Sequence, residues 1–195
     1  MTKSLLLVLL LAPSALVSFS QTNSQTQNEC RITGGFGFAG ATKNTKSVGQ
    51  DVWVQLDYKL SETISIATEF ENMTYKQPGY YETLPVDPNE IKVVDNNFSL
   101  LLKYHFPWNS KLKVAVASGW TYMTRQNDYY MYEIDGASQN WFRNVTSFSD
   151  YRIPFLLEVE YPISKKINIQ ARAKYNLNPQ NGDTYSSGIG LSLKL

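Results

Sequence analysis

Apolar and polar residues alternate with a period of two along most of the chain. The clearest stretch runs from Ile153 to Asn178 and alternates on both sides of a short break. Its apolar set is Ile153, Phe155, Leu157, Val159, Tyr161, Ile167, Ile169, Ala171, Ala173 and Tyr175, and its polar set is Glu158, Glu160, Asn168, Gln170, Arg172 and Lys174. A period of two places successive side chains on opposite faces of a β-strand. The stretch therefore predicts a hairpin with one apolar and one charged face.

The same alternation predicts eight strands in all. They are 32–41, 48–60, 64–75, 98–106, 112–123, the two strands of the hairpin, and 185–195. From the second strand onward, no Lys, Arg, Asp or Glu falls on the apolar face. Each strand has about 9–12 residues, which is the length of a tilted strand that crosses a bilayer.

The predicted connections alternate between short and long. The short ones are 60–64, 107–111 and 162–166, and the long ones are 42–47, 76–97, 124–148 and 178–184. In an up-and-down meander, all the short turns then lie at one end. Short periplasmic turns with longer outer loops are typical of outer-membrane barrels.

Aromatic residues gather near the strand ends on the apolar face. They are Tyr58, Tyr104, Phe106, Trp120, Tyr122, Tyr151, Tyr161, Tyr175 and Tyr185. Amphipathic rings prefer the bilayer interface. We therefore expect the apolar face to meet lipid and the charged face to line the interior. The alternative is a soluble lipocalin-like carrier with an apolar interior, which predicts neither aromatic girdles nor unequal loops.

The N-terminus predicts export from the cytoplasm. Lys3 precedes the apolar run Leu5–Leu11, and the small residues Ser18 and Ser20 precede a cleavage site. We expect a signal peptide at 1–20, a polar periplasmic leader at 21–31 and the barrel at 32–195. Cys30 is the single cysteine, so no disulfide forms within the chain.

The whole pattern resembles the small eight-stranded bacterial outer-membrane barrels, OmpX-like and OmpA transmembrane-domain-like, and the outer membrane protein beta-barrel domain family. The final stretch, GIGLSLKL, resembles the C-terminal signal that the barrel assembly machinery reads; Leu195 stands where the family usually has Phe or Tyr. The resemblance implies an all-β, antiparallel up-and-down transmembrane barrel. It also implies a monomer surrounded by outer-membrane lipid and lipopolysaccharide.

Charged residues on the inward face predict a filled interior, because eight strands leave only enough room for side chains. The main candidates are Glu69, Glu71, Lys103, Arg152, Glu158, Glu160, Arg172 and Lys174. Buried charges need partners, so we expect a salt-bridged network. In the hairpin, Glu158 and Glu160 should lie opposite or diagonal to Arg172 and Lys174. The alternative use of this face is a narrow conduit for ions or small solutes.

The third outer loop carries a second hairpin signal. Residues Tyr130, Tyr132 and Ile134 alternate before the turn dipeptide Asp135-Gly136. The aromatic residues of this loop are Tyr130, Tyr132, Trp141 and Phe142. They predict a ribbon above the membrane that binds an extracellular protein or glycan. Alternatively, these rings cover the barrel mouth or contact lipopolysaccharide.

Composition and motifs favour a non-enzymatic protein without a cofactor or metal. The net charge of +1 gives no electrostatic case for nucleic acid. No zinc-protease, nucleophile-elbow or phosphate-loop motif is present. The single histidine, His105, should lie at the periplasmic end, whereas an outer-leaflet lipid enzyme needs it at the other end. We expect a structural or adhesion-type role through the outer loops.

Overall fold

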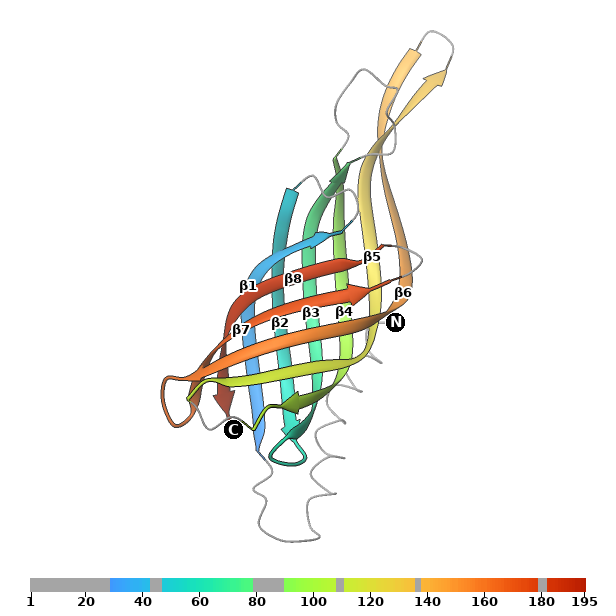
Figure 1. The fold of residues 1–195 in the computed structure, drawn as a ribbon. Coiled ribbons are helices and arrows are strands. Elements are labelled where there is room, and N and C mark those ends of the chain that lie inside the picture. Colours follow the sequence, from blue (N-terminus) through green and yellow to red (C-terminus); the bar gives the residue numbers. More distant parts are fainter. Residues whose placement is uncertain (1–28, 43–46, 79–89, 108–110, 136–137, 179–181) are drawn as a thin grey trace.

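The computed structural model describes residues 29–42, 47–78, 90–107, 111–135, 138–178 and 182–195. They form one closed antiparallel barrel in which each strand pairs with the next and β8 pairs with β1 (Figure 1). The strands are β1 Cys30–Ala41, β2 Ser47–Lys59, β3 Ile64–Pro78, β4 Glu90–His105, β5 Lys113–Asp135, β6 Ser138–Pro162, β7 Ile167–Leu177 and β8 Thr184–Lys194. The predicted eight-stranded up-and-down barrel is confirmed. The described residues include no helix of the length and apolarity that a membrane crossing requires.

The two faces of the wall are divided as the alternation predicts. On the outside, Leu102 and Leu191 are 59% and 58% exposed, while inward-facing Lys103 and Glu69 are each 1% exposed. An interior lined with charges is the opposite of what an apolar ligand carrier requires, so the lipocalin-like alternative is wrong. The apolar belt is the surface that faces lipid.

The upper limit of the apolar belt can be located from the rows of residues that pair across neighbouring strands. Phe70, Phe98, Tyr122 and Tyr151 lie side by side across β3 to β6. Tyr151 stacks on Trp120 with 4.6 Å between ring centroids. The next row of lipid-side residues, closer to the outer end of these strands, is Asn72, Asn96, Thr124 and Ser149. Asn72 donates a hydrogen bond of 2.8 Å to Asn96. The outer membrane interface therefore lies between these two rows.

Four strands continue beyond that interface, contrary to the predicted loops. The expectation of long loops at 76–97 and 124–148 is wrong, because β3 and β4 extend to 78 and from 90, and β5 and β6 leave only 136–137 between them. Figure 1 shows β5 and β6 rising above the other strands. Above the membrane the outward face meets water instead of lipid, so its residues are no longer apolar although strand pairing continues. The inward face stays buried there, as at Met73, Tyr75 and Val93. At the other end, β1 begins at Cys30, two residues before the predicted start.

Successive residues of β6 direct their backbone N–H and C=O groups alternately toward β5 and toward β7. Ile163 donates its N–H to the carbonyl of Ile167 at 2.9 Å, so odd-numbered residues of β6 bond toward β7 and even-numbered ones toward β5. Pro154 is even-numbered and has no N–H to offer. The pairing of β5 with β6 is accordingly interrupted between Ser118↔Phe155 and Thr121↔Arg152.

A buried tryptophan occupies the lumen against two glycine-bearing strands. Trp53 is 1% exposed and points inward from β2. A Cβ atom on Gly35 of β1 would come 2.2 Å from Cζ2 of its indole, and one on Gly188 of β8 would come 2.7 Å from Cζ3. Glycine at these positions therefore makes room for a large ring inside a narrow barrel.

Replacing Gly35 with Ala should destabilise the barrel by about 1–3 kcal/mol, since the added methyl group would lie 2.2 Å from Trp53 and 2.5 Å from the carbonyl oxygen of Ile189. Gly34→Ala is the matched control, because its Cβ would meet nothing closer than 3.9 Å. Urea unfolding in lipid vesicles measures both. Equal midpoints for the two variants would contradict close packing of Trp53 and the β8 backbone against Gly35.

Candidate functional site

Arg172 on β7 crosses the lumen and ends among carboxylates of β2 and β3. Its guanidinium donates to Asp51 at 2.9 Å and to Glu71 at 2.6 Å, and it also donates to Glu69. The guanidinium carbon lies 3.7 Å from the ring centroid of Trp53. A planar cation that both stacks on an indole and forks between carboxylates is a role that suits arginine rather than lysine.

Lys174 lies two residues along β7 and shares the same partners. Its ammonium donates to Glu69 at 2.5 Å, to Glu71 at 2.9 Å and to Ser99 at 3.2 Å. Ser186 of β8 donates to Glu71 at 2.7 Å. We call Asp51, Glu69, Glu71, Arg172 and Lys174 the central cluster. Five strands, β2, β3, β4, β7 and β8, meet in these contacts, so the cluster joins opposite walls of the barrel.

A second group of charges lies on the periplasmic side. Lys103 donates to Asp57 at 2.7 Å and forms an ion pair with Glu158. Glu160 forms an ion pair with Arg31. An apolar layer of Ala67, Leu101, Ala117 and Leu156 lies next to this group along the strands.

A third group lies on the outer side. Arg125 donates to both carboxylate oxygens of Asp95 at 2.7 Å and to the hydroxyl of Tyr75 at 2.6 Å. Arg152 lies 3.5 Å from Asp95 and donates to Thr184 at 2.6 Å. Three charged groups and two apolar clusters, the second formed by Ala39, Ala41, Met73, Tyr75 and Val93, thus occupy the lumen of the described barrel.

The structure distributes the predicted interior residues over all three groups. Glu69, Glu71, Lys103, Arg152, Glu158, Glu160, Arg172 and Lys174 are each at most 6% exposed. Register places Glu158 opposite Arg172 as expected, yet their charged ends pair with other strands. The inner face of a barrel is concave, so long side chains converge on the axis and meet distant strands there.

Sequence reasoning left out several members of these groups. Asp95 and Arg125 lay inside predicted loops, and Arg31 lay in the predicted leader. The missing signal was available for two of them. Extending the period of two from Ser99 leads to Asp95, and extending it from Thr121 leads to Arg125.

The outer part of β5 and β6, which we call the ribbon, comprises 129–135 and 138–144. Asn144 donates to the hydroxyl of Tyr129 at 3.0 Å. Just below, Arg143 donates two hydrogen bonds to Asp128 at 2.8 and 2.5 Å, and this contact lowers the pKa of Asp128. Both contacts link the two strands of the ribbon to each other.

The predicted aromatic residues all fall on this ribbon. Tyr130 is 54% exposed. Tyr132 pairs with Trp141 through the backbone, and Met131 pairs with Phe142. The side chains of Tyr132, Trp141 and Phe142 lie outside the described part of the structure. Their proposed binding role stays a prediction.

One edge of β6 has no partner above the membrane. β7 pairs with β6 only between Ile153 and Pro162. Within the described residues, no strand pairs with this edge from Ser138 to Arg152. On the other side of the ribbon, β4 stops pairing with β5 at Asp128.

The histidine lies at the opposite end of the molecule. His105 is the last residue of β4, and its Nε2 lies 2.8 Å from the hydroxyl of Ser65. Among the residues with described positions, no three His, Cys, Asp or Glu side chains gather to hold a metal ion.

Comparison with known proteins agrees with this architecture. The family model described as outer membrane protein beta-barrel domain matches residues 8–194. No curated protein matches the sequence.

Solved structures show the same fold at low identity. Neisserial surface protein A is 13% identical with a TM-score of 0.59, and the match covers 86% of this chain and 96% of that one. The Yersinia pestis attachment invasion locus protein Ail, in complex with the heparin analogue sucrose octasulfate, is 10% identical with a TM-score of 0.58 over 87% and 100%. OprG from Pseudomonas aeruginosa is 12% identical with a TM-score of 0.58 over 86% and 96%.

Replacing Lys174 with Met should cost about 3–5 kcal/mol, because it leaves buried Glu69 and Glu71 short of one cation. The double variant Lys174→Met with Glu69→Gln removes one charge of each sign and should cost less than the sum of the single changes. The unfolding midpoints of the wild type, the two single variants and the double variant, measured in lipid vesicles, complete this double-mutant cycle. Strict additivity would show that the two charges do not interact.

Proposed function

The chain belongs to the outer membrane protein beta-barrel domain family, and on that basis we propose that it is a surface-binding protein. It is an integral barrel of the bacterial outer membrane. In our proposal the barrel is an anchor, and the free edge of β6 is the binding element. The partner is an extended segment of an extracellular polypeptide that adds to this edge as a further strand. Export with removal of residues 1–20 and insertion by the barrel assembly machinery are part of the same proposal.

The observation that carries the proposal is the edge of β6 from 138 to 149, which pairs with no strand within the described residues. At Tyr151 the N–H already donates to the side chain of Asp150 at 2.7 Å. Odd-numbered residues of this edge direct their N–H and C=O groups away from β5. Such a row of backbone groups is a template for another strand. Native proteins usually blunt exposed edges with proline, bulges or frequent charges. This stretch has no proline, and its only charged residue is Arg143.

Side chains along the edge suit a polypeptide better than a sulfated sugar. Val145, Ser147 and Ser149 are small and exposed. The nearby cation Arg143 is engaged by Asp128. A sulfated glycan requires unpaired positive charge, which this surface offers little of. We therefore favour an extended peptide over the glycan.

The filled lumen argues against the alternative of a narrow conduit. Arg172, Lys174 and Trp53 are nearly inaccessible and span the interior with their partners. Water and ions need a continuous polar path, and moving this cluster would break several buried ion pairs. An enzymatic role has little support, because His105 lies at the periplasmic mouth rather than beside the ribbon.

The test removes one edge N–H without touching the β5 ladder. Short random peptides are selected by phage display on the protein in nanodiscs. Ser147→Pro should weaken the selected peptides by about tenfold or more, since it deletes a backbone donor and blocks the adjoining strand. Ser147→Val keeps the N–H and should bind as the wild type does.

A heat-dependent gel shift shows that each variant is folded. Undiminished binding by the folded Ser147→Pro variant would contradict strand addition. So would equal loss in the Ser147→Val variant, which would indicate recognition of the serine side chain.

A further inference from the structure

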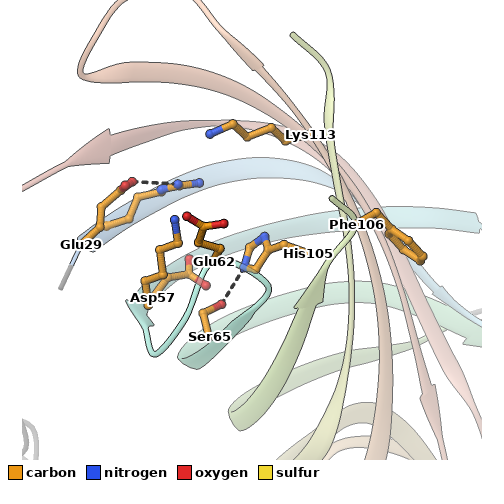
Figure 2. Close-up of a pocket in the computed structure, with 9 residues that line it drawn as sticks. Glu29, Asp57, Glu62, Ser65, His105, Phe106 and Lys113 are labelled. Carbon is orange, nitrogen blue, oxygen red and sulfur yellow. Dashed lines mark hydrogen bonds and ion pairs between the residues drawn. The ribbon is translucent and has the colours of Figure 1, made fainter. Parts of the chain in front are cut away.

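A pocket of about 150 Å³ opens at the periplasmic mouth, far from the ribbon (Figure 2). It is bounded by the start of β1, the β2–β3 turn and the ends of β4 and β5. A pocket of this size suits a small molecule rather than a macromolecule.

Several charges at the pocket are already neutralised by neighbours. Arg31 donates to Glu29 at 2.9 Å and pairs with Glu160. Asp57 accepts from Lys103 at 2.7 Å and from Gln55 at 2.8 Å. These groups form the fixed wall and floor.

Three other charges line the same pocket without forming an ion pair. Within the described residues, Lys59, Lys113 and Glu62 form none, although Lys113 lies opposite Glu160 on β6 and is attracted by Glu160 and Glu29. Figure 2 shows Lys113 entering from the β5 side and Glu62 from the β2–β3 turn. Ser65 and His105, joined at 2.8 Å, supply a polar wall between them. The pocket thus presents two ammonium groups and one carboxylate that are not committed to one another.

We propose that this pocket binds a small acidic amino acid from the periplasm. Its two carboxylates pair with Lys59 and Lys113, and its ammonium pairs with Glu62. Two positive groups and one negative group on the protein match two negative groups and one positive group on the ligand. This binding is independent of strand addition at the outer edge, which lies at the other end of the barrel.

Calorimetry on the intact protein in nanodiscs tests the assignment with L-glutamate as the probe. The Lys59→Gln, Lys113→Gln variant should bind about tenfold more weakly or worse, because two charge-assisted contacts are lost. The matched control is Lys165→Gln with Lys166→Gln, on the exposed β6–β7 turn outside the pocket, and it should bind as the wild type does. Failure of glutamate to bind at millimolar concentration would overturn the proposal. Unchanged binding in the Lys59, Lys113 variant would do the same.

Two further probes test whether the ammonium group of the ligand is recognised and whether the ligand is a free amino acid or the end of a peptide. Glutarate lacks the amine and should bind more weakly than glutamate, and Glu62→Gln should abolish that difference. Equal affinity in the wild type would remove the amino-acid assignment. A short peptide ending in glutamate is titrated in parallel, and binding of that peptide alone would overturn a free amino acid as the ligand.

Discussion

A strand inside a bilayer has no water to satisfy its backbone, so every N–H and C=O in the membrane must pair with another strand. This constraint closes the sheet on itself, with β8 bonded to β1. It also decides where a free edge is allowed. Within the described residues, β6 has no second partner beyond the end of β7, and all of this edge except Tyr151 and Arg152 lies above the row of rings that marks the outer interface. A departure within the wall lies at Pro154, where a single missing donor interrupts the ladder.

Closure with eight strands then dictates the chemistry of the interior. The lumen of an eight-stranded barrel is too narrow for a water-filled channel. The apolar residues of the strands lie on the outer face, toward lipid. Polar side chains must therefore fill the lumen, and their charges must be paired at close range. The central cluster achieves this by joining β7 to β2 and β3, with Trp53 between Arg172 and the glycines of β1 and β8. The same contacts fill the lumen and tie opposite walls of the barrel together.

The sequence predicted the membrane-spanning part well because lipid imposes a strict alternation there. Leu102 and Lys103 are neighbours in sequence and lie on opposite faces of the wall, as a period of two requires. The upper parts of β3 to β6 were missed because their outward residues, such as Asn96 and Thr124, are polar beyond the lipid, so the apolar half of the alternation is lost there. Nor could the alternation predict ion-pair partners. Arg172 meets Glu69, more than a hundred residues away, and only the curvature of the closed barrel brings them together.

The orientation of the two faces is the claim on which the rest depends, and two tryptophans report on it. Trp53 points into the lumen and Trp120 points outward at 57% exposure. In vesicles of brominated lipid, a variant that keeps only Trp120, with the other tryptophans changed to Phe, should lose most of its fluorescence. The variant that keeps only Trp53 should remain bright. Strong quenching of Trp53 together with a bright Trp120 would place the charged face toward lipid and contradict the account.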